Sequence, residues 1–425
     1  MKRIYHPAKK KIILIVDDDP VVVHIYQEKF QRQGFKVEVA GNGDSAMERL
    51  KKDRIDLVIL DLSLPGMNGV ELLKNIRLEF DVQALPVIVL SNAYLSDLRR
   101  IALDAGATKC IAKADSTPGK MLELVRELLA AGHSHAAGVT PELVVRNAAG
   151  TLSSQSETEF EKKLVASFLI NARVTLAKLR AGHQLFARTQ QEDLRQAQLS
   201  EMHRQIRPLA CSANLLGFRK IAPMADALEA LLIELHAKPT KITPSVIRTV
   251  AQGVDILAAL FDKATDLQTE VLVPPRILVV DDEIISRETI CSALGKANLT
   301  AVSLDDSLAA QRRLEQDHFD LIFLDVEMPG QSGLELCVKI REMATNRATP
   351  VVFVTSHSDF GSRAKSTLSG GNDFIAKPFL LVELVVKSLT WLFKESLRPL
   401  ATAGQSSASA EAGVTNCSQP WVMPR

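Results

Sequence analysis

Two short segments of this chain place a carboxylate directly after a run of apolar residues. VILDLSLPGMNG occupies residues 58–69, and a close copy, IFLDVEMPGQSG, occupies residues 322–333. In each segment the apolar run ends on an aspartate, Asp61 or Asp325, and the chain then turns through proline and glycine. An aspartate at the point where a buried strand reaches the surface can act as a nucleophile or as a metal ligand.

The two segments belong to a longer internal repeat. The offset between matching residues is 264 throughout, and four separated matches in one register indicate a duplicated domain at 11–131 and 276–395. Beside the aspartate segments, the matching pairs are KIILIVDDDP (11–20) with RILVVDDEI (276–284), VIVLSNA (87–93) with VVFVTSH (351–357), and ATKCIAKA (107–114) with GNDFIAKPF (371–379).

Short β-branched runs alternate with amphipathic stretches in each copy, and this pattern predicts five βα units. Such units form a parallel sheet that is buried on both faces and joined by right-handed crossovers, so the predicted class is α/β. Ligands of these sheets bind beyond the carboxyl ends of the strands. The polar residues expected there are Asp17, Asp18, Asp61, Ser91 and Lys113 in the first copy, and Asp281, Asp282, Asp325, Thr355 and Lys377 in the second.

Three neighbouring carboxylates repel one another unless a cation compensates them, and Mg²⁺ prefers such oxygen ligands. In the first copy we expect Asp18 and Asp61 as direct ligands, Asp17 acting through water, and the carbonyl group of Ser63 completing the protein's share. The equivalent set in the second copy is Asp281, Asp282, Asp325 and the carbonyl group of Glu327.

An ion-bound aspartate beside a lysine suits phosphoryl transfer. Asp61 would be the nucleophile, Mg²⁺ and Lys113 would hold the phosphoryl oxygens, and the Ser91 hydroxyl would hydrogen-bond to the captured group. Asp325, Lys377 and Thr355 have the same roles in the second copy.

Both copies resemble the receiver domains of two-component response regulators, the CheY-like family. The family pattern has an acidic pair after the first strand, Asp after the third, Ser or Thr after the fourth and Lys after the fifth. The resemblance implies a flavodoxin-like fold with strand order 2-1-3-4-5, aspartyl phosphorylation by a phosphohistidine donor, and two conformational states. The partner would be a sensor histidine kinase or a phosphotransfer protein.

The two copies differ at two positions of the family pattern. Proline follows the lysine in the second copy, as Lys377-Pro378, whereas alanine follows Lys113. The aromatic switch position, three residues before the lysine, is Phe374 in the second copy but Cys110 in the first. We therefore expect the first copy to signal differently.

The region between the copies predicts a four-helix bundle. We expect a linker at 132–154, helical segments within 155–266, and a second linker at 267–275. Pro208 lies inside one predicted helix, where it removes a hydrogen bond, so a kink or break is expected near residue 207.

The bundle resembles a histidine-phosphotransfer domain that has lost its histidine. RPLACSANLLG at 207–217 follows the family's H-x-L-K-G-S-A-x-x-L-G pattern, but Arg207 stands where the phosphoaccepting histidine should be. An arginine cannot be deprotonated and cannot accept the phosphoryl group. His203, one helical turn earlier, is an alternative acceptor. Docking, dimerisation or spacing are the roles expected of the bundle, and an unrelated helical connector remains an alternative.

Composition limits the remaining possibilities. The net charge is +1, with 46% hydrophobic and 24% charged residues, so we expect neither a nucleic-acid partner nor a membrane surface. Five scattered cysteines without a CxxC pair favour the cytoplasm. Residues 1–10 are expected to form an N-terminal arm, and 396–425, rich in Ala, Ser and Gly, a disordered tail.

The sequence therefore predicts a signalling protein rather than an enzyme with a separate substrate. It would accept phosphate on Asp61 and Asp325 and act through a protein contact, with dimerisation through receiver or bundle surfaces also consistent. One alternative is a relay in which His203 passes phosphate between the two aspartates. Another is a scaffold whose receivers do no chemistry.

Overall fold

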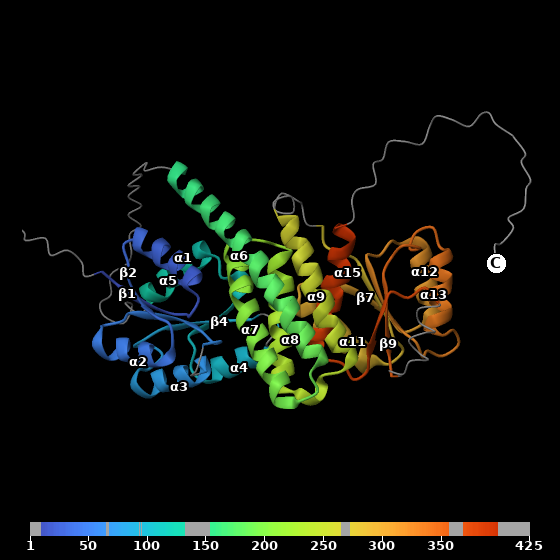
Figure 1. Ribbon diagram of the computed structural model, residues 1–425, viewed down its shortest axis with the longest axis horizontal. Coiled ribbons are helices and arrows are strands. Elements are labelled where there is room, and N and C mark those ends of the chain that lie inside the picture. Colours follow the sequence, from blue (N-terminus) through green and yellow to red (C-terminus); the bar gives the residue numbers. More distant parts are fainter. Residues whose placement is uncertain are drawn as a thin grey trace, which may run out of the picture.

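The computed structural model describes residues 10–64, 68–92, 94, 96–131, 154–264, 273–356 and 369–397. Figure 1 shows an α/β body, a group of helices and a second α/β body in a row along the longest axis. The predicted arm, the linker at 132–154 and the tail fall almost wholly outside the described residues, as does most of the linker at 267–275.

The first copy forms the predicted parallel five-stranded sheet, with strand order β2-β1-β3-β4-β5. Alternate residues of each strand face opposite sides: Ile13 and Ile15 belong to the core cluster that contains α1 and α5, and Leu14 and Val16 belong to the one that contains α2 and α3. The strands are β1 (Ile12–Val16), β2 (Lys36–Ala40), β3 (Leu57–Asp61), β4 (Val87–Ser91) and β5 (Lys109–Ala112). The helices are α1 (Pro20–Arg32), α2 (Gly43–Lys52), α3 (Gly69–Glu79), α4 (Ser96–Asp104), η1 (Lys113–Asp115) and α5 (Pro118–Ala131).

The second copy repeats this topology, with strand order β10-β9-β8-β6-β7. Both sheets thus have the order 2-1-3-4-5 that the family resemblance implies. The strands are β6 (Ile277–Val280), β7 (Ala301–Leu304), β8 (Leu321–Asp325), β9 (Val351–Thr355) and β10 (Asp373–Ala376). The helices are α11 (Ile284–Lys296), α12 (Ser307–Gln316), α13 (Gly333–Glu342) and α15 (Leu381–Ser396).

Four long helices form the middle region, as predicted. They are α6 (Ser154–Arg188), α7 (Glu192–Leu215), α8 (Ile221–Ala237) and α9 (Pro244–Asp262), with the short η2 (Pro239–Lys241) before α9.

Of the kink or break expected near residue 207, the break is wrong, because α7 continues through Pro208. Pro208 is exposed, whereas Ile206, Leu209 and Ala210 around it are buried against the bundle. The buried face holds the helix together, and Arg204, whose carbonyl group loses its usual partner to the proline, is an exposed residue.

The bundle and the second sheet share one hydrophobic core. Buried residues of α8, α9, α11, α15 and the β6–β10 sheet form a single cluster. Gly253 of α9 sits at this junction, because a Cβ atom there would lie 2.6 Å from Leu228 of α8 and 3.1 Å from Val386 of α15. Within the described residues, α9 is the one helix long and apolar enough to cross a membrane, and 56% of its apolar window is buried inside the protein.

Candidate functional site

The second copy brings its predicted polar residues together at the carboxyl ends of its strands. Ligand atoms of Asp281, Asp282 and Asp325 lie within 4.8 Å of one another. The Nζ atom of Lys377, which follows β10, lies 2.8 Å from Asp325 Oδ2 and 3.0 Å from Asp281 Oδ2. Thr355 is buried at the end of β9. Because these strands are parallel and adjacent, residues distant in the sequence meet on one edge.

Backbone groups of the turn after β8 orient the Asp325 carboxylate. The amide of Glu327 donates a hydrogen bond to Asp325 Oδ1, at 3.2 Å, and so orients the carboxylate. Gly333 begins α13 in direct contact with the strand end, and a Cβ atom there would lie 1.8 Å from the carbonyl oxygen of Asp325. Only glycine therefore allows the helix to start so close to the aspartate.

Burial and the neighbouring Asp281 carboxylate raise the pKa of Asp325, against the lowering effect of Lys377. Burial alone would lower the pKa of Lys377, but its hydrogen bonds to Asp325 and Asp281 outweigh burial and raise it. The lysine is thus held in its charged form beside the carboxylate.

The first copy places the equivalent residues in the same way. Ligand atoms of Asp17, Asp18 and Asp61 lie within 4.8 Å of one another. Lys113 Nζ lies 3.0 Å from Asp61 Oδ2, and the amide of Ser63 donates to Asp61 Oδ1 at 3.2 Å. The Ser91 hydroxyl is buried at the end of β4, 3.5 Å from the Cys110 sulfur. The two copies therefore share one arrangement of chemical groups.

A further side chain enters the first cluster from outside the copy. The Nη2 atom of Arg207, on α7 of the bundle, lies 2.5 Å from Asp61 Oδ2, 2.5 Å from Asp18 Oδ1 and 3.8 Å from Asp17 Oδ1. The Arg207 side chain is 9% exposed, and that of Asp61 is fully buried. One guanidinium group thus pairs with all three carboxylates that were expected to hold Mg²⁺.

The charges of this cluster shift two pKa values in opposite directions. Burial and the Asp61 carboxylate raise the pKa of Asp17 to about 8. Burial would also raise the pKa of Asp61, but Lys113 and Arg207 outweigh it and lower the value to about 2. Asp61 is therefore the carboxylate that stays ionised between its two cations.

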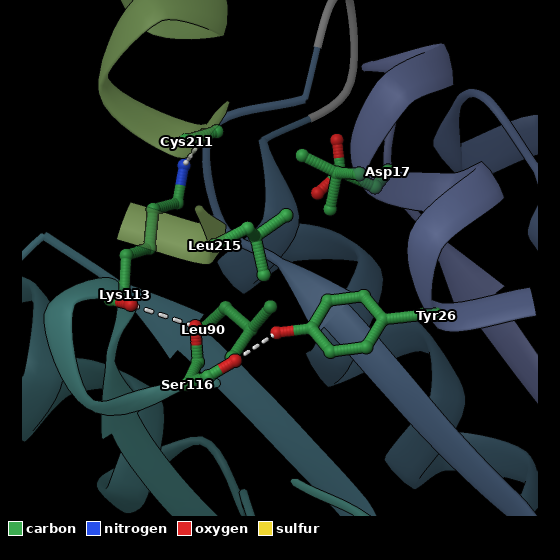
Figure 2. Close-up of a pocket in the computed structure, with 8 residues that line it drawn as sticks. Asp17, Tyr26, Leu90, Lys113, Ser116, Cys211 and Leu215 are labelled. Carbon is green, nitrogen blue, oxygen red and sulfur yellow. Dashed lines mark hydrogen bonds between the residues drawn. The ribbon is translucent and has the colours of Figure 1, made fainter. Parts of the chain in front are cut away.

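Figure 2 shows the floor of this site, where α7 meets the first copy. Lys113 reaches up to Cys211, and its Nζ atom donates to the Cys211 sulfur at 3.2 Å. Leu215 points into the same pocket beside Tyr26, whose hydroxyl donates to the carbonyl oxygen of Ser116. The cavity left between these side chains is only about 10 Å³, the space of a single water molecule.

Helix α8 completes the contact through Asn92, the residue after β4. Its Nδ2 atom donates to Glu229 at 2.8 Å and to the carbonyl oxygen of Asp226 at 2.9 Å. Both Asn92 and Glu229 are buried. His203, the alternative acceptor, lies 3.6 Å from Glu229, and the bundle side chain that contacts Asp61 is Arg207 instead.

The aromatic position of the second copy also meets the bundle. The Arg248 guanidinium of α9 lies 4.6 Å from the centre of the Phe374 ring, and Phe374 is buried. The peptide bond between Lys377 and Pro378 is cis. Phe374 could be predicted from the sequence but Arg248 could not, because nothing in the sequence indicates which face of the second copy the bundle covers.

The model of the family described as "Response regulator receiver domain" matches residues 13–126 and 277–388, more than half of the chain. The chain belongs to the response regulator receiver family. Both copies are therefore receivers, and they are called the first and the second receiver below.

Several curated proteins are similar to one receiver's length of this chain. The "Transcriptional activator protein IrlR" of Burkholderia pseudomallei (strain 1026b) is 35% identical over 112 residues, which are 26% of this chain and 48% of that protein. The "Phosphate regulon transcriptional regulatory protein PhoB" of Klebsiella pneumoniae is 37% identical over 112 residues, which are 26% and 49%. The chain thus spans about half the length of these relatives, and the transcriptional roles in their names belong to those proteins.

Solved structures show the same partial likeness. A receiver domain protein described as CheY-like, from Methanospirillum hungatei JF-1, is 26% identical and covers 30% of this chain and 98% of its own, with a TM-score of 0.28. A structure described as "putative two-component system response regulator/ggdef domain protein" covers 91% of this chain and 99% of its own, at 17% identity and a TM-score of 0.33. The family assignment rests on the family model and the sheet topology.

Receivers generally bind Mg²⁺ at this acidic pocket, and the two sites fit the ion differently. In the second receiver three carboxylates converge and the cation paired with them, among the described residues, is Lys377. Oxygen donors of this kind and number suit Mg²⁺. The first receiver has the same donors, but the guanidinium of Arg207 already lies among them.

Proposed function

We propose that this chain is a phosphoacceptor of a two-component system, with Asp325 and Asp61 as the residues that accept phosphate from phosphohistidine. The observation that carries the proposal is the ammonium group of a lysine within 3.0 Å of the acceptor carboxylate in both receivers, beside two further aspartates. A sensor histidine kinase or a phosphotransfer protein would supply the phosphate.

The second receiver illustrates the chemistry. An oxygen of Asp325 forms a bond to phosphorus as the bond between phosphorus and the imidazole nitrogen breaks, which leaves histidine and an aspartyl phosphate. Lys377 pairs with the transferred oxygens, and the Thr355 hydroxyl donates a hydrogen bond to them. Mg²⁺, held by Asp281, Asp282, Asp325 and the carbonyl group of Glu327, would neutralise charge on the phosphoryl group.

The first receiver has the same groups in Asp61, Lys113 and Ser91. Asp17, Asp18, Asp61 and the carbonyl group of Ser63 would hold the metal there. We propose that both receivers report through protein contacts. The bundle supports this, because it touches the acidic pocket of one receiver and the aromatic position of the other. The pathway would operate in the cytoplasm.

Intact mass after incubation with acetyl phosphate and Mg²⁺ tests this proposal. We expect up to two phosphoryl groups on the unmodified chain, with the two sites lost separately in Asp61→Ala and Asp325→Ala and both lost in the double variant. An added mass that persists in the double variant would place the chemistry elsewhere. No addition to any variant would favour a scaffold whose receivers do no chemistry.

The relay through His203 is a second candidate, because this histidine lines a cavity of about 420 Å³ together with Ser63 of the first receiver. The chemical stability of the label separates the two candidates. Label on aspartate is stable in acid and lost in base, whereas label on His203 would be lost in acid and kept in base. Acid-labile phosphate that disappears in His203→Ala would establish the relay.

A further inference from the structure

The contact between α7 and the first receiver lies on the acceptor itself. Arg207 reaches the three carboxylates from the bundle side, and its guanidinium contacts Asp61 through the same Oδ2 atom that pairs with Lys113. The Asp61 side chain is fully buried under this contact. A phosphodonor cannot approach the Asp61 oxygens while Arg207 is in place, because the nucleophile must be within contact distance of phosphorus.

The charge of Arg207 also replaces that of a metal. Three carboxylates in one site repel unless a cation sits among them, and Arg207 supplies that cation within 3.8 Å of all three. A planar guanidinium matches carboxylates well and stays charged at all relevant pH values. Mg²⁺ would need the Asp18 and Asp61 oxygens that Arg207 occupies, so the two cations compete for them.

The rest of the interface shows that this contact is built into the fold. Cys211 belongs to the core cluster of the first receiver, although it lies on α7 of the bundle, and Leu215 packs against that cluster. Asn92 is hydrogen-bonded to α8 through Glu229 and Asp226. These contacts place the helix that carries Arg207 in one register against the pocket.

The position of Arg207 in the sequence indicates why this residue contacts the acceptor. Arg207 aligns with the phosphoaccepting histidine in the pattern that the bundle resembles. It therefore lies against Asp61 at the position where the histidine of a phosphotransfer domain would carry the phosphate. Because arginine stays protonated, it cannot carry a phosphoryl group in that way. The bundle therefore places the residue at the donor position against Asp61, but this residue lacks the donor's chemistry.

We propose that the bundle is an internal pseudo-donor that closes the first receiver, with Arg207 occupying the metal position and covering Asp61 until the bundle undocks. The first receiver then accepts Mg²⁺ and phosphate only in the fraction of molecules in which α7 has moved away. The inference rests on the proposed acceptor role of Asp61. The effect that it predicts on Mg²⁺ binding does not depend on that role.

Mg²⁺ binding and labelling of Asp61 test the proposal in the full chain. In an Asp281→Asn/Asp325→Ala background, only the first receiver keeps its acidic cluster. Arg207→Ala should tighten Mg²⁺ binding, measured by calorimetry, by at least about tenfold, because apparent affinity falls with the fraction of closed molecules. It should speed labelling of Asp61 by acetyl phosphate by a similar factor. Arg207→Lys should lie between, since lysine has fewer donors.

Arg204→Ala is the matched control, because Arg204 lies on the same helix but is exposed and paired with Glu201. It should behave as the background. Equal Mg²⁺ affinity and equal labelling in the background and in Arg207→Ala would overturn the proposal. Tighter Mg²⁺ binding without any label on Asp61 would instead support the closed pocket and contradict the acceptor role of Asp61.

If the Arg207→Ala variant does not fold, a measurement on the unmodified chain tests the same proposal. The number of Mg²⁺ ions bound is compared with amide hydrogen exchange in α7. We expect either one ion per chain with slow exchange near Arg207, or a second ion at higher concentration together with faster exchange there. Two ions bound with unchanged exchange in α7 would overturn the proposal.

Discussion

The two receivers carry the same carboxylates and lysine in their acidic pockets but expose them to different extents. The acceptor side chain is 7% exposed at Asp325 and 0% at Asp61, and the lysine side chain is 16% exposed at Lys377 and 5% at Lys113. The difference comes from the bundle, which contributes Arg207 to the first pocket. An acidic pocket of one design is thus paired with its own lysine in both receivers, but it is also occupied by a bundle side chain in the first.

The two receivers also differ in the helices that they pack against the bundle and in the charges on them. The second receiver is joined to the bundle through α11 and α15 in one continuous core. Lys387 of α15 and Asp373 of β10 are both buried there, 2.9 Å apart. The matching residues of the first receiver, Glu123 and Lys109, are exposed and have the opposite charges. The bundle therefore covers these two positions in the second receiver and leaves them exposed in the first.

The largest effect is expected at the covered face. Lys387→Met leaves the carboxylate of Asp373 buried without its lysine, which should lower the free energy of unfolding by about 3 kcal/mol. The value lies at the lower end of the usual range because Arg248 is 3.8 Å from Asp373. Urea denaturation of the full chain measures it.

Glu123→Met is the matched control in the first receiver. Because Glu123 is exposed, its replacement should change the free energy of unfolding by no more than about 0.5 kcal/mol. Similar losses in both variants would show that the two receivers are not packed as differently as the structure indicates.

A smaller effect is expected in the pH dependence of stability at the bundle side of the first pocket. Burial and the Glu229 carboxylate raise the pKa of Asp226 to about 8. A carboxyl group whose pKa is higher in the folded chain contributes its full stabilisation below its pKa in the unfolded chain. This contribution is lost as the pH rises toward its pKa in the folded chain. Stability should therefore decline between about pH 4 and pH 8.

Asp226→Asn removes this titration and keeps the amide of Asn214 within hydrogen-bonding reach of an oxygen. The variant should reduce the decline of stability with pH by up to about 1.4 kcal/mol per pH unit, the limit for one proton. Urea denaturation at pH 5, 6, 7 and 8 gives the two slopes. Parallel curves for the variant and the unmodified chain would mean that Asp226 is ionised in the fold.

Much of each receiver could be predicted from the sequence, because its signals are local. A buried run that ends on Asp61 or Asp325, and a lysine 52 residues later, place both ends of the Lys–Asp pairs at strand termini. The parallel sheet follows from the alternation of strands and helices. The strand order came from the family resemblance, since periodicity alone does not determine which strands are neighbours.

The contacts between the domains could not be predicted in the same way. Arg207 and Asp61 are 146 residues apart, and their meeting depends on the shapes of two surfaces rather than on any local pattern. In the sequence, Arg207 indicates only the loss of a histidine. The signal present in the sequence was the place of Arg207 at the histidine position of the phosphotransfer pattern. The break expected near Pro208 was wrong for a similar reason, because burial of the neighbouring residues outweighs the tendency of proline to end a helix.

The most direct test is the rate at which each aspartate of the unmodified chain is labelled. The chain is incubated with acetyl phosphate and Mg²⁺, and peptide mass spectrometry follows Asp61 and Asp325 separately over time. Closure of the first pocket predicts that Asp325 is labelled at least about tenfold faster than Asp61, and that Arg207→Ala reduces this ratio. Equal rates at the two aspartates, unchanged by Arg207→Ala, would contradict the account.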